Sequence, residues 1–272
     1  MIDPGLKALA GKRIVLTRTP EQSDILLHKL KGSGAQIVVL PFVEFRRVED
    51  LAPLDAALSR VAEFDWLVFT SQHAVQFFCE RLRELGGAPM DLPASLRSVA
   101  IGVGTYNAAL MERLRVEPLT FETRSGREFV RAFSPRARGR KVLLPQSDLA
   151  GPHIAEGLRK GGAQVTAIVA YRTCMPESLD REALARVRRE GADIAVFASP
   201  SAFRNFSATV GEVDLKRFAA TSAFAAIGPT TARAIREAGI PVVIEAEKPN
   251  SDEIIKAMIA HFSKAESVKA RE

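Results

Sequence analysis

An internal repeat runs through the sequence. Residues 65–71 recur as residues 193–199, and residues 100–102 recur as residues 226–228 at nearly the same offset. In both copies, short apolar runs that are typical of buried strands alternate with segments of helical spacing. Such alternation favours parallel sheets covered by helices on both faces. The repeat therefore predicts two related α/β domains.

The expected strands follow from the apolar runs, and the expected helices begin just after them. We expect strands at residues 13–17, 37–43, 66–69, 98–101 and 141–144, and a weak strand near Leu119. A helix is expected to begin at Pro20, because proline suits the first helical position. Glycines end that helix near residue 32.

Small or hydroxylic residues follow several of these strands. In open parallel sheets, ligands bind outside the carboxyl ends of the strands. This rule selects positions at helix starts: residues 17–19, Ser71, residues 102–105, residues 146–148, Ser199 and residues 228–231.

The junction at residues 225–235 illustrates the pattern. An apolar run breaks at Gly228, Pro229 suits the first turn of a helix, and Thr230 and Thr231 lie beside backbone N–H groups that have no intrahelical partner. Such a turn can hold an anion. The alternative is a capped strand–helix junction without a ligand.

Composition and charge narrow the class of ligand. The chain has 272 residues, a net charge of +6 and a pI near 9.5, which favours acidic partners. Its two cysteines, Cys79 and Cys174, are far apart, as expected in a reducing compartment. No apolar run is long enough to span a bilayer, and residues 1–11 lack the apolar segment of a signal peptide. We therefore expect a cytoplasmic protein without a membrane partner.

Several kinds of chemistry have no signature in the sequence. The four histidines form no metal-binding pair, and Ser71 and Ser199 lie in no nucleophile elbow. Residues 102–104 resemble part of a dinucleotide motif, but Asn107 stands where its third glycine belongs. Basic residues between 136 and 141 lack the interleaved aromatics of a single-stranded nucleic-acid site. We expect no metal, no organic cofactor and no nucleic acid, and a site that suits a polyanion.

The chain resembles the uroporphyrinogen-III synthase family over about residues 11–262. The most specific match is the sequence AIGPTTA at residues 226–232. Supporting matches are LTR at 16–18, FTS at 69–71, AYRT at 170–173 and FASPS at 197–201. In one departure, Gln146 and Ser147 stand where many relatives carry Arg-Gly.

The resemblance implies an α/β fold of two flavodoxin-like, doubly wound parallel-sheet domains joined by two crossing strands. The crossings are expected near residues 42–47 and 169–175. One domain then combines residues 1–42 with residues 173–272, and the other is residues 43–172. The active site is expected in the cleft between them.

The resemblance also implies an activity. The substrate is hydroxymethylbilane, a linear tetrapyrrole with carboxylates on every ring. It loses its terminal hydroxyl as water and closes to uroporphyrinogen III with inversion of the last ring. Because the bilane also closes uninverted without an enzyme, catalysis consists mainly of positioning. The expected protein is a monomer that needs no cofactor, and the preceding bilane-forming enzyme is a candidate partner.

Site residues carry over from the matching motifs. The resemblance makes Tyr171 a candidate proton donor to the departing hydroxyl, with an aromatic packed at the hinge as the alternative. It makes Arg18 a carboxylate partner, with a surface arginine as the alternative. For the serines and threonines the alternative is helix capping. The candidate catalytic residues are Tyr171 and Thr231, and the candidate substrate-binding residues are Thr17, Arg18, Ser71, Gly104, Thr105, Ser199, Ser201, Gly228, Thr230 and Thr231.

A second class of function fits the same features. The fold, the basic charge and the helix starts also suit a non-catalytic, two-domain binder of an anionic metabolite. Turnover of the bilane distinguishes the two.

Overall fold

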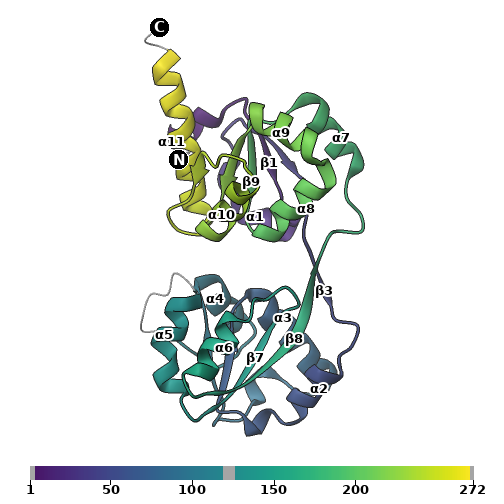
Figure 1. Ribbon diagram of the computed structural model, residues 1–272, viewed down its shortest axis with the longest axis vertical. Coiled ribbons are helices and arrows are strands. Elements are labelled where there is room, and N and C mark those ends of the chain that lie inside the picture. The colour runs from purple at the N-terminus through teal and green to yellow at the C-terminus, as the bar shows by residue number, and fades with distance from the viewer. Residues whose placement is uncertain (1–3, 119–125, 270–272) are drawn as a thin grey trace. The chain divides into compact units, whose positions relative to one another are not determined.

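A computed structural model describes residues 4–118 and 126–269, and it has the expected α/β architecture (Figure 1). The chain divides into two compact units. Unit 1 comprises Met1–Glu44 and Cys174–Glu272, and unit 2 comprises Phe45–Thr173. The chain passes from one unit to the other at β3 (Glu44–Arg47) and again at the end of β8 (Gln164–Cys174). These two strands are neighbours in one sheet and are the connecting strands that the resemblance implies.

Unit 1 is built on a five-stranded sheet in the order β11-β10-β9-β1-β2, and its neighbouring strands run parallel. Its strands are β1 (Arg13–Leu16), β2 (Gln36–Val39), β9 (Ile194–Phe197), β10 (Ala223–Ala226) and β11 (Ile244–Glu245). Read from β2, this is the 2-1-3-4-5 order of flavodoxin-like folds.

Side chains of the unit 1 strands alternate between two cores. Ile14 and Leu16 pack with α1 and α11, whereas Val15 packs with α7, α8, α9 and α10 on the other face. Burial on both faces accounts for the continuous apolar runs in the sequence. The covering elements are η1 (Pro4–Leu9), α1 (Pro20–Leu30), α7 (Arg181–Glu190), α8 (Pro200–Val210), α9 (Glu212–Thr221), α10 (Pro229–Glu237) and α11 (Ser251–Lys269).

Unit 2 is built on a six-stranded sheet in the order β3-β8-β7-β4-β5-β6. Its other strands are β4 (Trp66–Phe69), β5 (Arg97–Ala100), β6 (Val116–Glu117) and β7 (Lys141–Ser147). When β7 and β8 are matched to β1 and β2, the order β8-β7-β4-β5-β6 reproduces that of unit 1. The internal repeat of the sequence is therefore a repeat of sheet position.

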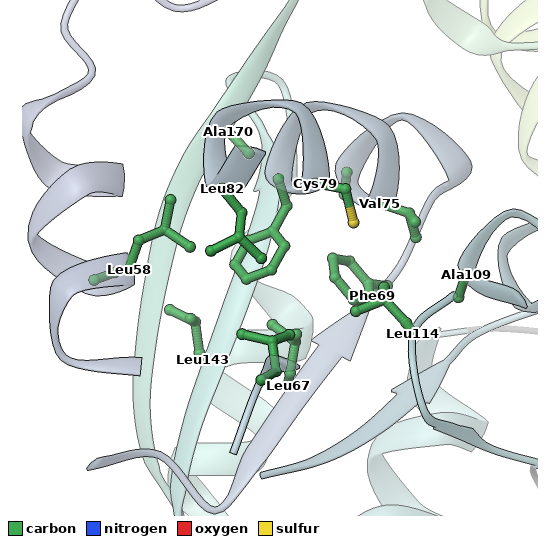
Figure 2. Packing of buried hydrophobic residues seen from close by; sticks show 14 of the residues in the cluster. Leu58, Leu67, Phe69, Val75, Cys79, Leu82, Ala109, Leu114, Leu143 and Ala170 are labelled. Carbon is green, nitrogen blue, oxygen red and sulfur yellow. The ribbon is translucent and has the colours of Figure 1, made fainter. Parts of the chain in front are cut away.

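Helices cover both faces of the unit 2 sheet as well. Residues from α2, α3 and α4 form one core with Leu67 and Phe69 of β4, and residues from α5 and α6 form the other with Trp66 and Val68. Figure 2 shows Val75 and Cys79 of α3 within the first core, next to Phe69. The covering elements are α2 (Ala52–Ser59), η2 (Val61–Glu63), α3 (Gln72–Glu84), η3 (Pro89–Asp91), α4 (Val103–Met111), α5 (Gly126–Ala137) and α6 (His153–Lys160).

The structure corrects the extent of one predicted strand. The apolar run at residues 37–43 was expected to be a strand throughout, but β2 ends at Val39. The backbone N–H groups of Leu40 and Phe42 still donate to the carbonyls of Leu16 and Thr17, at 2.9 Å and 3.2 Å, so this segment follows β1 for a few residues beyond the regular ladder. Leu40 and Phe42 are nonetheless buried in the core. The weak strand expected near Leu119 lies outside the described residues, and β6 forms just before it.

Candidate functional site

The predicted site residues fall into one group in each unit. In unit 1, β1, β9 and β10 are neighbours in the sheet, so the residues that follow them share one edge. In unit 2, the same holds for the residues that follow β4 and β5 and for those at the end of β7 and β8. Thr17, Arg18, Ser199, Ser201, Gly228, Thr230 and Thr231 belong to unit 1, and Ser71, Gly104, Thr105 and Tyr171 belong to unit 2.

Ser71 and Ser199 occupy equivalent positions as N-caps. The Ser71 Oγ accepts a hydrogen bond from the backbone N–H of Ala74 at 3.0 Å, and the Ser199 Oγ accepts one from Ala202 at 3.1 Å. The capping alternative is therefore present at both serines. Each hydroxyl can still donate its proton elsewhere, and the Ser199 Oγ lies 3.0 Å from the Ser201 Oγ. Capping and ligand contact are compatible at these positions.

Two helices that carry candidate site residues begin after a glycine and have no side-chain cap. The N-caps of α4 and α10 are Gly102 and Gly228. Gly102 has a φ of +83°, which favours glycine, whereas Gly228 is extended at −169°. These turns leave backbone N–H groups without a side-chain acceptor, which is the arrangement that an anion can satisfy.

A threonine lies in the first turn of each of these two helices. Thr105 and Thr231 both stand three residues after the glycine, and they are 7% and 2% exposed. Their burial means that a larger side chain at either position has to displace its neighbours. Thr230, in contrast, is exposed. At Gly104 an added Cβ would lie 3.8 Å from the Gln72 Oε1, an ordinary van der Waals contact, so space does not require glycine there.

Thr17 and Arg18 follow β1 and differ in their surroundings. The fully buried Thr17 hydroxyl donates to the backbone carbonyl of Val196 at 2.8 Å, so it links β1 to β9. The Nε of Arg18 is buried and has no hydrogen-bond partner among the described residues. Burial lowers the pKa of this guanidinium, which nevertheless stays protonated at neutral pH. A buried donor without an acceptor is costly, and an incoming carboxylate would satisfy it.

Tyr171 and Ser71 are brought together from segments 100 residues apart. The Tyr171 hydroxyl lies 2.9 Å from the Ser71 Oγ. The Tyr171 ring stacks on Phe77 at 5.6 Å and is also close to Phe45 and His73, and the residue is only 5% exposed. Burial raises the pKa of Tyr171, so the phenol stays neutral at physiological pH. The packed-aromatic role and the contact with a second site residue are both present.

Sequence reasoning missed a network beside this pair. The Ser147 Oγ lies 2.8 Å from the Thr173 Oγ1 and donates to the Asp148 carboxylate at 2.9 Å. Asp148 also accepts from the backbone N–H of Thr173 at 2.8 Å, which ties the end of β7 to β8. The available signal was that residues 146–148 follow an expected strand, but the partner at Thr173 follows only from the pairing of β7 with β8.

A separate hollow of about 850 Å³ lies elsewhere in unit 1. Its lining includes Arg188, Asp193, Asp214 and Phe218, and none of the predicted site residues. Asp193 immediately precedes β9, whereas Ser199 follows it, so this hollow is at the amino end of the strand. It does not belong to the candidate site.

The described residues offer no alternative metal or membrane site. Within residues 4–118 and 126–269, no group of three or more His, Cys, Asp or Glu side chains is placed to hold a metal ion. No helix in that same part of the chain has the length and apolar character needed to cross a membrane.

Two known proteins of similar sequence are named uroporphyrinogen-III synthase. A uroporphyrinogen-III synthase of Synechococcus elongatus is 28% identical over 254 residues, which cover 92% of this chain and 95% of that protein. The chloroplastic uroporphyrinogen-III synthase of rice is 29% identical, with 96% of this chain and 89% of that protein covered.

Solved structures show the same fold at lower identity. A mutant uroporphyrinogen III synthase of Thermus thermophilus superposes with a TM-score of 0.63 at 15% identity, covering 93% of this chain and all of that chain. The enzyme from Helicobacter pylori gives 0.61 at 17% identity, covering 92% and 99%. The family model described as uroporphyrinogen-III synthase HemD matches residues 11–256. This chain thus belongs to the uroporphyrinogen-III synthase family.

Proposed function

We propose that this enzyme converts hydroxymethylbilane to uroporphyrinogen III. The substrate loses its terminal hydroxyl as water, and the resulting azafulvene is attacked at the substituted carbon of the last ring. The spiro intermediate then fragments and closes again with that ring inverted. Membership of the family and its place in tetrapyrrole biosynthesis support this reaction class.

The observation that carries the proposal is the unsatisfied Nε of Arg18 at the carboxyl end of β1. A guanidinium whose Nε has no partner among the described residues suits a carboxylate of the substrate, because a charge-assisted hydrogen bond satisfies both groups. The uncapped turns at Gly102 and Gly228 supply further N–H donors for the same kind of group. Each such contact is worth about 0.3–1 kcal/mol, so several together can hold a polycarboxylate.

Catalysis in this proposal is mainly positioning. The unassisted bilane closes without inversion, so the enzyme has to favour the conformation in which the last ring is attacked at its substituted carbon. Holding reacting atoms in a near-attack geometry can supply about 7–11 kcal/mol of barrier reduction. Arg18, Thr105 and Thr231 are the residues that we propose to fix the carboxylate arms of the substrate.

A coupled assay with freshly prepared hydroxymethylbilane tests the proposal. The expected result is uroporphyrinogen III in excess over the type-I isomer, measured by chromatography of the oxidised products. A protein that binds the bilane while the type-I isomer still forms at the unassisted rate is a binder, and that result would refute the proposal.

A further inference from the structure

The hydrogen bonds around Tyr171 determine which of the neighbouring hydroxyl groups can donate a hydrogen bond to a ligand. Ser147 has a single hydroxyl proton, and the Asp148 carboxylate at 2.9 Å can only accept, so that proton goes to Asp148. The Thr173 hydroxyl at 2.8 Å must then donate to the Ser147 Oγ. The backbone N–H of Leu149 donates to the same oxygen at 3.2 Å. Both lone pairs of the Ser147 Oγ are therefore occupied.

Ser147 also interacts with the Tyr171 hydroxyl. Because the Ser147 oxygen is saturated, the Ser71 Oγ at 2.9 Å is the acceptor that remains for the Tyr171 proton among the described residues. That oxygen also accepts from the backbone N–H of Ala74 at 3.0 Å. With two donors on its lone pairs, Ser71 still has its own hydroxyl proton to give. Ser71 is half-buried, whereas Tyr171 is only 5% exposed.

We infer that Ser71 donates a hydrogen bond to the substrate. Tyr171 is then a positioning residue, because its own hydrogen bond to the Ser71 Oγ orients the Ser71 hydroxyl. This inference rests on the proposed function, and the ligand group is an acceptor oxygen, either a carboxylate or the departing hydroxyl. It exchanges the roles of the two residues relative to the expectation from the sequence, in which Tyr171 itself is the candidate proton donor to the departing hydroxyl. Burial also raises the pKa of Tyr171, which makes the phenol a weaker acid.

A double-mutant cycle tests whether Tyr171 acts through Ser71. We expect Ser71→Ala to lower kcat/KM by roughly 10- to 100-fold, as for a lost hydrogen bond to a charged group. Tyr171→Phe should lower it by roughly three- to tenfold when Ser71 is present, and by less than twofold in the Ser71→Ala background. Equal losses in the two backgrounds would show that Tyr171 contacts the substrate independently and would overturn the inference.

Two further variants separate hydroxyl donation from helix capping. Ser71→Thr keeps both the cap and the hydroxyl, so it should recover most of the lost activity. Asp180→Ala removes the equivalent N-cap of α7, where Asp180 accepts from the Ala183 N–H at 2.8 Å, and should lower the melting temperature without changing kcat/KM. If Ser71→Ala changes only the melting temperature, the inference is wrong. A loss confined to KM identifies a carboxylate as the acceptor, and a loss in kcat identifies the departing hydroxyl.

A measurement on the ligand-free protein separates this inference from the proposed function. Tyr106 is the only other tyrosine, so Tyr106→Phe leaves a single tyrosine signal. With ¹³Cζ-labelled tyrosine in that background, Ser71→Ala should shift the Tyr171 resonance and Asp180→Ala should not. A Tyr171 resonance unchanged by Ser71→Ala would refute the hydrogen bond whether or not the protein turns over the bilane. If the resonance shifts but no bilane is converted, the proposed function fails while the hydrogen-bond assignment stands.

Discussion

Individual side chains at the strand ends differ in whether the fold itself uses them. The hydroxyl of Thr17 donates its proton to the Val196 carbonyl, whereas the Nε of Arg18 has no partner among the described residues. Thr231 is buried at the start of a helix that has no side-chain cap. Ligand binding can depend on the polar groups to which the fold gives no hydrogen-bond partner.

Thr231→Met should nearly abolish formation of the type-III isomer, while Tyr171→Phe should keep a measurable fraction. Thr231 is 2% exposed, so methionine crowds the turn, and a misplacement of about 1 Å can cost on the order of a hundredfold. Thr231→Ser keeps the hydroxyl and should stay active. The product ratio is measured after circular dichroism and melting show that each variant is folded. A folded, active Thr231→Met beside an inactive Tyr171→Phe would contradict positioning by this turn.

Arg18→Gln should raise KM by roughly 10- to 100-fold with a smaller change in kcat, because it removes a charged contact to a carboxylate. Folding stability should not fall, since the Nε has no partner to lose within residues 4–118 and 126–269. Arg189→Gln, at an exposed arginine of α7, is the matched control and should change neither quantity. The KM of the native protein should also rise with salt. An unchanged KM in Arg18→Gln would remove Arg18 from the site.

At the scale of elements, α3 connects the site to the core of unit 2. Its N-cap is Ser71, and its buried face carries Val75 and Cys79 against β4 (Figure 2). Phe78 is on the same face, with its ring 5.5 Å from that of Phe69. Any loosening of this face would move the Ser71 hydroxyl. The Cys79 thiol lies on this face, so its ionisation reports on how well the face is buried.

Stability should fall with rising pH above about 9 because of Cys79. Burial raises the pKa of this thiol from about 9 to about 12. Between these values the unfolded chain loses the thiol proton while the folded chain keeps it, so each pH unit costs up to about 1.4 kcal/mol. Below pH 9 the thiol is protonated in both states and contributes no slope.

Urea unfolding at a series of pH values from 8 to about 10.5 measures this slope. Cys79→Ala should flatten the alkaline loss, whereas Val75→Ala, which also leaves a cavity on α3, should keep it. Parallel slopes in the native protein and Cys79→Ala would show that the thiol is not buried as described.

At the scale of the whole molecule, unit 2 is inserted in the sequence between the two segments that form unit 1. Unit 1 joins the N-terminal 44 residues to the segment that begins at Cys174, and unit 2 is continuous. The five strands of unit 1 come from both ends of the chain, so β1, which pairs with β2 on one side, pairs on the other side with β9, a strand that is synthesised late. Loop-closure entropy opposes such long-range pairing, which makes unit 1 depend on the presence of both segments.

A fragment of residues 43–172 should therefore fold alone, with a cooperative thermal transition by circular dichroism. It contains the six strands of one sheet and the helices of both faces, apart from the last residues of β8. Fragments cut near residue 138 should not fold, because each then holds parts of two sheets. If those halves unfold cooperatively and the 43–172 fragment does not, the assignment of these residues to one domain is wrong.

The sequence by itself determined the repeat, the alternation of strands and helices, and the helix starts at Pro20, Ser71 and Ser199. These features depend on residue types a few positions apart, because apolar periodicity and capping are local. Helix starts after strands also gave the candidate site, since parallel strands end at a common edge. Which strands exchange between the units followed only from the family resemblance.

Only the tertiary structure decided how the site side chains are paired. The contact of Tyr171 with Ser71 joins segments 100 residues apart, and the network of Ser147 with Thr173 requires the register of β7 on β8. The same pairing of strands occupied the Thr17 hydroxyl and left the Arg18 Nε free of partners in the described chain. A hydrogen bond needs two atoms within about 3 Å, and for residues distant in sequence that distance is set by strand register and packing rather than by local pattern.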